Sequence, residues 1–307
     1  MCPFIMNQIV LSVVVSTYNR AVILKICLES LEKQGLSKDL YEVIIVDNNS
    51  SDATAEVSQA FVSRNSNFRY VLETNQGLSY SRNRGWKEAK GTYIAYIDDD
   101  GRAYPDWLEN MYDFIQRMPE IKVFGGPYDA FALVEIPNWY PPEYGTLDRG
   151  PDEIALDFSR GGITGTNMVF HRSLFIEHGG FNTDLGMKGE TEAYGEETEY
   201  ISKLYKQGIT VYYVPQMKVS HLVADYKLSV FYILKSIYKS HRDSFKKNFQ
   251  EPSLCYLLWR VVESIFVCIY LLFKKRNLPF KRALCYSFAG LAGSLGDLAG
   301  YMKKKFK

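Results

Sequence analysis

The amino-acid sequence predicts an α/β protein with a mostly parallel, Rossmann-like sheet, followed by a helical C-terminal region. Short β-branched runs alternate with amphipathic helical segments through the first 100 residues. This strand–helix rhythm is typical of right-handed, mostly parallel α/β sheets. From about residue 228 onward the rhythm is replaced by long apolar stretches interleaved with basic residues, which indicates a separate helical region.

The first 100 residues contain four expected strands and three expected helices. The strands are short apolar runs of the kind that parallel sheets bury on both faces. They are expected at residues 9–16, 42–46, 68–72 and 93–97. The helices between them are expected at residues 21–34, 53–62 and 78–89, and glycines at 35 and 91 mark two of their ends.

A second block follows residue 120, where the strand–helix rhythm breaks. Residues 127–160 are rich in Pro, Tyr, Trp and Asp, which predicts a long functional loop or lid. After this loop we expect a strand near 166–171, a helix near 173–177, an acidic helix at 196–207 and a strand at 210–214. The chain then divides into residues 1–226 and a helical region of residues 227–307, with a helix break near residues 277–279.

Charge is distributed unevenly between these two regions. Residues 227–307 carry sixteen Lys/Arg and four Asp/Glu, a net charge of +12, although the 307-residue chain has a net charge of +1. A basic, apolar tail on an acidic body predicts an anionic membrane surface as partner. Long aliphatic runs interrupt the basic residues, so no nucleic acid is expected. The five cysteines lack CxxC spacing, and no secretory signal is evident, so we expect unpaired thiols in a reducing compartment.

Polar side chains follow four of the expected strands at the points where the strands end. Ligands of open α/β sheets bind at this edge, so these side chains are expected to form one nucleotide pocket. Three adjacent carboxylates repel one another and favour Mg²⁺ or Mn²⁺, whereas a plain acidic turn is the competing interpretation. The candidates, in chain order, are Thr17, Tyr18, Arg20, Asp47, Asn49, Gly77, Arg82, Asp98, Asp99 and Asp100.

At these residues the chain resembles the family 2 glycosyltransferases, which are inverting enzymes with the A-type nucleotide-sugar fold. The resemblance covers roughly residues 9–221, and the order and spacing of seven segments make it specific. It implies a catalytic domain at residues 1–226, in which residues 1–120 bind the nucleotide sugar and residues 121–226 serve the acceptor. The segments are VVVSTYNR, VIIVDNNSSDAT, NQGLSYSRNRG, YIDDDGRAYPDWL, GTNMVFHRSLFIEHGGFNTDLG, GEETEYISKLYKQG and VPQMKVSH.

The resemblance implies specific roles for the residues that would hold the donor. Thr17, Tyr18 and Asp47 stand where the family holds the nucleobase, which is most often uracil. Arg82 is implied to lie near the diphosphate, and Asp98 is implied to face the ribose. A UDP-sugar is therefore the expected donor.

The resemblance also implies a metal site and a general base. Asp100 would hold Mn²⁺ or Mg²⁺ with Asp99 close by, and His221 would complete the metal shell or touch the diphosphate. An inverting transfer needs one base to take the proton of the acceptor hydroxyl. Glu197 is the expected base because it aligns with the second member of the family's acidic pair. That member is usually Asp, so Glu196 stays open as the base, and helix capping by both residues is the structural alternative.

Four further residues are assigned to the acceptor side of the site. Trp139 lies in a segment rich in Pro, Trp and Tyr, and its ring would stack on a sugar or, alternatively, pack the loop onto the body. Gly165, Thr166 and Asn167 would let the backbone approach a sugar, or would form a plain turn.

Two apolar segments in the tail are candidates for contact with a membrane. Residues 254–273 contain only Arg260 and Glu263 as charges and are long enough to span a bilayer. Residues 283–302 contain Gly296 and Gly300, whose GxxxG spacing favours close helix packing in lipid. A double span would carry the basic cluster between them across the membrane, so in-plane or re-entrant helices on the cytoplasmic face are expected. A soluble appendage or an oligomer interface is the alternative.

The sequence therefore predicts a metal-dependent, inverting glycosyltransferase of the hexosyltransferase class. It would move a sugar from a nucleotide diphosphate donor to a hydroxyl of a glycan or lipid-linked acceptor at the cytoplasmic membrane face. A nucleotidyltransferase on a similar sheet is one alternative. A non-catalytic scaffold subunit of a polysaccharide assembly is another, and the two intact acidic sets speak against it.

Overall fold

The computed structural model describes residues 9–157, 162–189, 195–244, 252–275 and 277–305. The basic residues at 246–247 and 276, and Cys2, lie outside these ranges. The chain forms two compact units, which are described separately. The first comprises Met1–Asp129 with Thr146–His221, and the second comprises Ala130–Gly145 with Leu222–Lys307.

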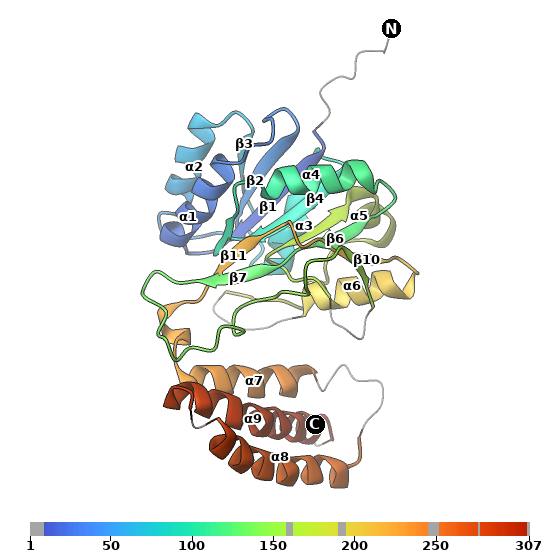
Figure 1. The fold of residues 1–307 in the computed structure, drawn as a ribbon. Helices are drawn as coiled ribbons and strands as arrows, with labels where there is room; N and C mark the ends of the chain where they lie inside the picture. Colours follow the sequence, from blue (N-terminus) through green and yellow to red (C-terminus); the bar gives the residue numbers. More distant parts are fainter. Residues whose placement is uncertain (1–8, 158–161, 190–194, 245–251, 276, 306–307) are drawn as a thin grey trace. The chain divides into compact units, whose positions relative to one another are not determined.

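An eight-stranded sheet lies at the centre of the first unit, with the strand order β3-β2-β1-β4-β9-β6-β10-β8 (Figure 1). The first four neighbours are parallel, whereas β9 runs antiparallel to both β4 and β6. This arrangement confirms the predicted Rossmann-like sheet and adds antiparallel pairing in its second half. The strands are β3 (Phe68–Leu72), β2 (Tyr41–Asp47), β1 (Leu11–Thr17), β4 (Tyr93–Asp98), β9 (Met168–His171), β6 (Val123–Gly125), β10 (Val211–Tyr213) and β8 (Ile154–Leu156).

Helices cover both faces of this sheet, and each strand contributes alternate side chains to two separate cores. Val13 and Val15 of β1 enter one core, while Val14 enters the other. This two-sided burial explains why the strands read as continuous apolar runs. The first core packs against α1 (Ala21–Glu32), α2 (Thr54–Arg64) and α4 (Trp107–Arg117), and the second against α3 (Leu78–Glu88), α5 (Arg172–His178) and α6 (Glu196–Lys206).

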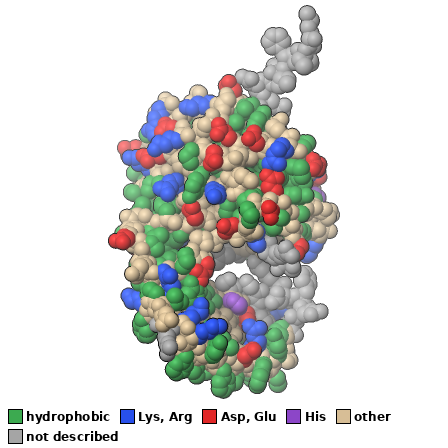
Figure 2. Space-filling model, in the orientation of Figure 1, with side chains coloured by type: hydrophobic (Ala, Val, Ile, Leu, Met, Phe, Trp, Pro, Cys, Tyr) green, Lys and Arg blue, Asp and Glu red, His purple; other side chains and the backbone are tan. Residues whose placement is uncertain are grey.

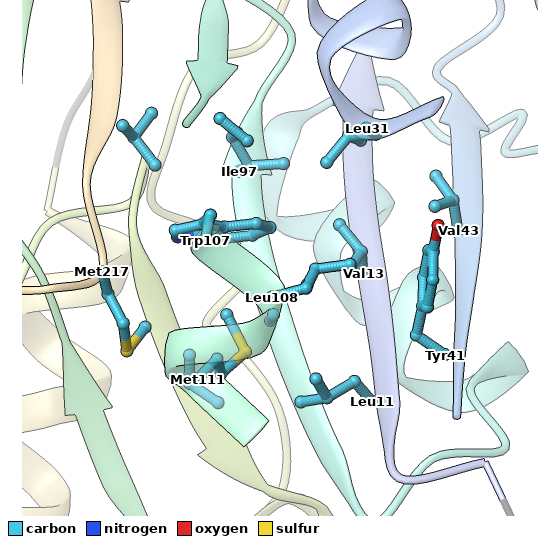
Figure 3. Close-up of a cluster of buried hydrophobic side chains, with 14 of the residues drawn as sticks. Leu11, Val13, Leu31, Tyr41, Val43, Ile97, Trp107, Leu108, Met111 and Met217 are labelled. Atoms are coloured by element: carbon cyan, nitrogen blue, oxygen red, sulfur yellow. The ribbon is translucent and has the colours of Figure 1, made fainter. Parts of the chain in front are cut away.

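Helix α4 is an element that the sequence analysis did not predict. Its Trp107, Leu108 and Met111 are fully buried, and Figure 3 shows them beside Leu11 and Val13 of β1. The apolar residues along α4 have helical spacing. The sequence analysis assigned the start of this segment only to the motif YIDDDGRAYPDWL, which contains the aspartate triplet. The helix closes the first core beneath the strand ends.

A small second sheet in the order β5-β11-β7 places a histidine beside the aspartate triplet. β5 (Gly101–Ala103) follows the triplet directly, and β11 (Val219–Leu222) pairs with it in antiparallel register. The register sets His221 opposite Gly101. Strand β7 (Tyr128–Phe131) is the third member.

The second unit is built from three long helices and residues 130–145. They are α7 (Val230–Ser244), α8 (Leu254–Lys274) and α9 (Phe280–Lys305), and a short 3-10 turn, Asp225–Lys227, precedes them. The predicted helix break is confirmed, because α9 begins just after Pro279. Tyr140 is buried with Ile233 and Cys285. Residues 130–145, which were predicted as part of one loop serving the acceptor, therefore pack with the C-terminal helices.

Candidate functional site

The sheet register brings the predicted strand ends together. Ser16 of β1 lies beside Asp98 of β4, and Thr17 lies beside Asp47 of β2. Parallel strands end at a common edge, so the polar residues that follow them gather there. Thr17 and Asp47 are both buried at this edge.

Asp47 organises the turn that was predicted to hold the nucleobase. Its carboxylate accepts hydrogen bonds from the Ser50 amide and the Tyr70 hydroxyl, both at 2.9 Å. Asn49 in this turn has a φ of 62°, a left-handed conformation that asparagine tolerates. Tyr18 follows Thr17 at the end of β1 and is half-buried. The nucleobase roles of Thr17, Tyr18 and Asp47 stay predictions.

Gly77 ends the third strand–helix turn and begins α3. Its φ of 144° is a conformation that side chains rarely adopt, and its amide donates to Asn48 Oδ1 at 2.7 Å. Asn48 also donates to the carbonyl oxygens of Glu73 and Asn75. The turn is therefore rigid, and it presents the backbone at the edge where the donor is expected.

Arg20 and the aspartate triplet are directly paired. Arg20 Nη1 lies 3.0 Å from Asp99 Oδ1 and 3.0 Å from Asp100 Oδ2. The attraction of Asp99 and Asp100 raises the pKa of Arg20 above its ordinary value. Burial raises the pKa of Asp99 to about 7, against the attraction of Arg20. The predicted donor-binding residue Arg20 thus contacts the acidic cluster itself.

Asp98, Asp100 and His221 form the group that fits a divalent cation. One potential ligand atom from each lies within 4.8 Å of those of the others, and His221 Nε2 is 3.2 Å from Asp100 Oδ1. Two carboxylates and an imidazole supply the oxygen and nitrogen donors that suit Mn²⁺. The geometry joins His221 to Asp100, as the sequence analysis expected. It also adds Asp98, which had been assigned to the ribose.

Arg82 links this acidic group to the start of α6. Its Nη2 lies 3.0 Å from Asp98 Oδ1, and its Nη1 lies 2.7 Å from Glu196 Oε1 and 3.6 Å from Glu197 Oε2. The side chain of Arg82 is only 3% exposed. Burial acts to lower its pKa, but the nearby Asp98 and Glu196 carboxylates reverse the shift and the pKa rises. The guanidinium of Arg82 is thus engaged by three carboxylates, and its expected place near the diphosphate stays a prediction.

The two members of the acidic pair differ in their surroundings. The Glu196 side chain is 4% exposed, whereas that of Glu197 is 25% exposed. Burial raises the pKa of Glu196 to about 7, even though Arg82 acts in the opposite direction. Both residues lie in the first turn of α6, where the helix dipole favours negative charge. Glu196 therefore faces inward to Arg82, and Glu197 reaches the more open side.

The predicted acceptor residues fall into different environments. A Cβ added to Gly165 would lie 2.3 Å from Arg82 Nη2, so Gly165 leaves room for that guanidinium. Asn167 is fully buried: its Oδ1 accepts from Trp107 Nε1 at 3.0 Å and its Nδ2 donates to two backbone carbonyls. Thr166 is buried as well. The Asn167 side chain is thus an internal brace, and the approach of the backbone to a sugar at residues 165–167 stays a prediction.

Trp139 belongs to the second unit, where Tyr140 packs against its ring. Arg282 donates to the carbonyl oxygen of Trp139 at 3.2 Å, and Lys281 Nζ lies 5.4 Å from the ring centre. Its acceptor role stays a prediction. The link between Arg82 and Glu196 is the main feature that sequence reasoning missed, and no local pattern connects residues 114 positions apart.

A doubly covered, mostly parallel sheet with an acidic cluster at its strand ends is the architecture of the A-type glycosyltransferases. Residues 12–179 match the family model for glycosyl transferase family 2. The chain belongs to this family.

Curated relatives match over part of their length. The glucosyl-dolichyl phosphate glucuronosyltransferase of Haloferax volcanii is 30% identical over 190 residues, which is 60% of each chain. The GalNAc(5)-diNAcBac-PP-undecaprenol beta-1,3-glucosyltransferase of Campylobacter jejuni is 29% identical over 203 residues, 64% of this chain and 60% of its own. The chain therefore spans about 60% of the length of these two relatives.

Solved structures show the same fold at low sequence identity. The mannosyltransferase PcManGT from Pyrobaculum calidifontis, in complex with GDP-Man and Mn²⁺, has a TM-score of 0.58 and 17% identity, covering 96% of this chain and 75% of its own. S. aureus TarS 1-349 in complex with UDP has a TM-score of 0.56 and 17% identity, covering 97% and 92%. These neighbours support the fold assignment.

Proposed function

We propose that this family 2 glycosyltransferase is metal-dependent and inverting, and that it transfers a hexose from a UDP-sugar to a hydroxyl of a glycan or lipid-linked acceptor. One observation carries the proposal: Arg82 joins the cation-binding group, through Asp98, to the acidic pair at the start of α6. Arg82 thereby holds the group that would bind the leaving diphosphate close to the acidic pair that would supply the base for the acceptor. The structural neighbours include both a UDP complex and a GDP-Man complex, so the choice of UDP rests on the resemblance to the family.

Asp98, Asp100 and His221 would hold Mn²⁺ or Mg²⁺ in this proposal. When bound, such a cation neutralises the charge that develops on the leaving diphosphate. Arg20 supplies the chain's own positive charge at the same edge through its contacts with Asp99 and Asp100. The rigid turn at Gly77 and the buried Thr17 and Asp47 would hold the nucleotide beside this cluster.

Glu197 is the proposed general base. A base must reach the acceptor hydroxyl to take its proton, which favours the more exposed carboxylate of the pair. Glu196 is also enclosed by its ion pair with Arg82, whereas Glu197 is more open to an entering substrate. Glu196 would therefore position the pair, and Glu197 would remove the proton.

The first prediction tests this division of roles with Glu197→Gln and its matched control Glu196→Gln. We expect Glu197→Gln to lower turnover by about 10²–10⁴-fold, the usual contribution of a general base. Donor binding should stay near that of the unchanged protein, because the base acts on the acceptor. Calorimetry with Mn²⁺ and UDP-sugars measures donor binding, and transfer to lipid-linked sugars measures turnover.

Three outcomes would contradict the proposal. Full turnover in Glu197→Gln with loss in Glu196→Gln would move the base by one residue. Release of pyrophosphate instead of nucleoside diphosphate would indicate a nucleotidyltransferase. Donor binding without turnover on any acceptor, in a protein with both acidic sets intact, would favour a scaffold.

The site of action is proposed to be the cytoplasmic membrane face. The names of two relatives specify lipid-linked substrates, a dolichyl phosphate and an undecaprenol diphosphate. In the part of the chain that the structure describes, α8 is long and apolar enough to cross a membrane, with 21 residues and a mean hydropathy of 1.8. Oligomer formation through the C-terminal helices stays a prediction.

A further inference from the structure

Helix α8 has a buried ridge and an exposed aromatic ridge on opposite sides. Leu257 and Ser264 are buried, while Trp259, Phe266 and Phe273 are 64%, 68% and 74% exposed. A spacing of seven residues keeps each set on one face, and position 259 lies about 200° around the helix from position 257. The aromatic ridge runs for about 21 Å along the helix.

Most of the remaining surface of α8 is also apolar and exposed. Soluble proteins rarely expose a continuous apolar patch of this kind, so its presence marks an interaction surface. Figure 2 shows hydrophobic side chains along the lower margin of the view, where Figure 1 places α8. The other exposed large hydrophobic residues are Leu254, Tyr256, Leu258, Val262, Ile265, Val267, Ile269 and Tyr270, and the charged residues Arg260 and Glu263 are exposed among them.

Within the second unit, α9 packs against both α7 and α8. Towards α8, Ser294 of α9 hydrogen-bonds Ser264 at 2.8 Å inside the helix pair. Towards α7, Asp297 of α9 pairs with His241 at 3.2 Å. If α8 crossed a bilayer, α9 would have to follow it or separate from it. If α9 followed α8, the His241–Asp297 ion pair would enter the acyl chains. If α9 separated from α8, the buried Ser264 and Ser294 would be exposed.

Basic residues flank both ends of the exposed face. Lys274 and Lys275 lie at the C-terminal end of α8. Leu257, near the other end, packs with Tyr301 of α9, so Lys303–Lys305 come close to the N-terminal end of α8. A spanning α8 would place these two basic clusters on opposite sides of the bilayer. An α8 that lies in the plane places both at the headgroups, where anionic lipids attract them.

We propose that α8 is an in-plane docking helix for an anionic lipid bilayer. Its Trp259–Phe266–Phe273 ridge enters the acyl boundary, and the basic clusters at its two ends contact the headgroups. Helix α9 covers the opposite side of α8 and stays outside the acyl region. This assignment is independent of the catalytic proposal, and it needs no donor or acceptor to be tested.

Depth-dependent quenching of tryptophan fluorescence by brominated lipids tests the orientation of α8 in the membrane, and it uses the full chain. Vesicles of phosphatidylcholine and phosphatidylglycerol carry bromine either near the headgroup or deep in the acyl chain. The fluorescence of Trp259 alone is obtained by subtracting the fluorescence of Trp259→Phe from that of the unchanged protein. The double variant Trp259→Phe with Phe266→Trp moves the reporter by two helical turns while conserving the composition of the ridge.

An in-plane helix gives both reporters the same shallow quenching profile. A spanning helix gives position 266 the stronger quenching by deep bromine and position 259 the stronger quenching by shallow bromine, and this result would overturn the proposal. Absence of quenching at both positions would also overturn it. If the protein then forms a dimer that Phe266→Ser disrupts, the ridge is a contact between two copies.

A matched pair of substitutions tests the apolar contribution. Phe266→Ser should weaken vesicle binding about tenfold or more, since a large apolar side chain no longer leaves water. Ile176→Ser removes a similarly exposed residue, 70% exposed on α5, and should leave vesicle binding unchanged. Equal binding by the unchanged protein and Phe266→Ser, or equal losses in both variants, would contradict docking through this ridge. Thermal midpoints identify any loss that arises from unfolding.

Discussion

Arg82 contacts both acidic groups of the site. A buried guanidinium beside Asp98, Glu196 and Glu197 compensates carboxylates that would otherwise repel one another without solvent. Breaking such a buried pair by removal of one partner is strongly destabilising, because the remaining charges have no counter-ion. The residue therefore sets both the spacing and the ionisation of the site.

Gly165→Ala should destabilise the protein by disturbing this guanidinium. Its new Cβ would lie 2.3 Å from Arg82 Nη2, a distance that forces the buried side chain to shift. We expect a loss of about 1–3 kcal/mol in the free energy of unfolding, as for other overpacked positions. Gly162→Ala is the control, because its Cβ would meet Ile201 at an ordinary 3.7 Å. Urea unfolding compares the variants, and equal stability of the two would contradict the role of Gly165.

Glu196 should make stability fall as pH rises. Its pKa is about 7 in the folded protein against an ordinary value of 4.5, so the folded state binds the proton more tightly. Below pH 4.5 both states are protonated and the group contributes nothing; above pH 7 the full cost is present, on the order of 3 kcal/mol. Urea unfolding in EDTA between pH 5 and pH 8 measures the slope.

Glu196→Gln should flatten that slope in part, because Asp99 also has a raised pKa and contributes with the same sign. Gln cannot titrate, so only the contribution of Asp99 and weaker groups would remain. A slope that is unchanged in Glu196→Gln would show that the proton is held elsewhere.

At the scale of elements, helix α9 fixes the segment that carries Trp139. Arg282 donates to the carbonyl oxygens of Asn138, Trp139 and Tyr140, so one side chain satisfies three backbone acceptors. The hydroxyl of Tyr286, one turn further along α9, donates to Glu143 at 3.0 Å. A segment that the composition predicted as a free loop or lid is thereby bound to a helix.

Arg282→Ala should therefore loosen residues 137–144. Its loss leaves the carbonyl acceptors without their partner, and we expect faster hydrogen exchange in this segment together with a lower thermal midpoint. Lys281→Ala is the control, since Lys281 lies over the Trp139 ring and, among the described residues, makes no hydrogen bond to the backbone of this segment. Mass spectrometry of exchange measures both variants. Identical protection of residues 137–144 in the two variants would rule out the clamp.

At the scale of the whole molecule, the C-terminal helices form part of the hydrophobic core of the second unit. Removing them would expose the rest of that core to solvent. Cys285 of α9 is fully buried against Tyr140, Val223 and Ile233, which precede residue 250 in the chain. The sequence analysis treated the apolar tail as a distinct region, and the structure shows that its last helix completes the second unit. Loss of α9 therefore has a structural effect besides any effect on membrane binding.

A chain that ends at Gln250 should aggregate or unfold at a lower temperature than the full chain. The cause is the apolar surface of Tyr140, Val223 and Ile233 that α9 covers in the full protein. Light scattering and thermal unfolding in detergent-free buffer compare the two chains. A monodisperse truncated chain with the midpoint of the full protein would show that α9 is dispensable for folding.

The sequence by itself determined the elements whose signal is local. Apolar runs and helical periodicity predicted the parallel half of the sheet and its helices, because burial imposes a repeat on neighbouring residues. Strand ends then predicted that the aspartate triplet would share an edge with Thr17 and Asp47, and the register confirms this placement. Helix α4 was not predicted although its apolar spacing is local, because its first residues were assigned to the motif that begins with the aspartate triplet.

Only the tertiary structure decided which distant residues meet. The pairing of Arg82 with Glu196 joins α3 to the start of α6, and no repeat in the sequence predicts it. The same holds for the Asn167 side chain, whose buried hydrogen bonds to Trp107 and to two backbone carbonyls join segments far apart in the sequence. On α8 apolar residues lie on every side of the helix, with Arg260 and Glu263 as the charges, so the sequence did not separate the ridge that packs on α9 from the ridge that faces out. That difference arises from contacts between helices, which exist only once the chain has folded.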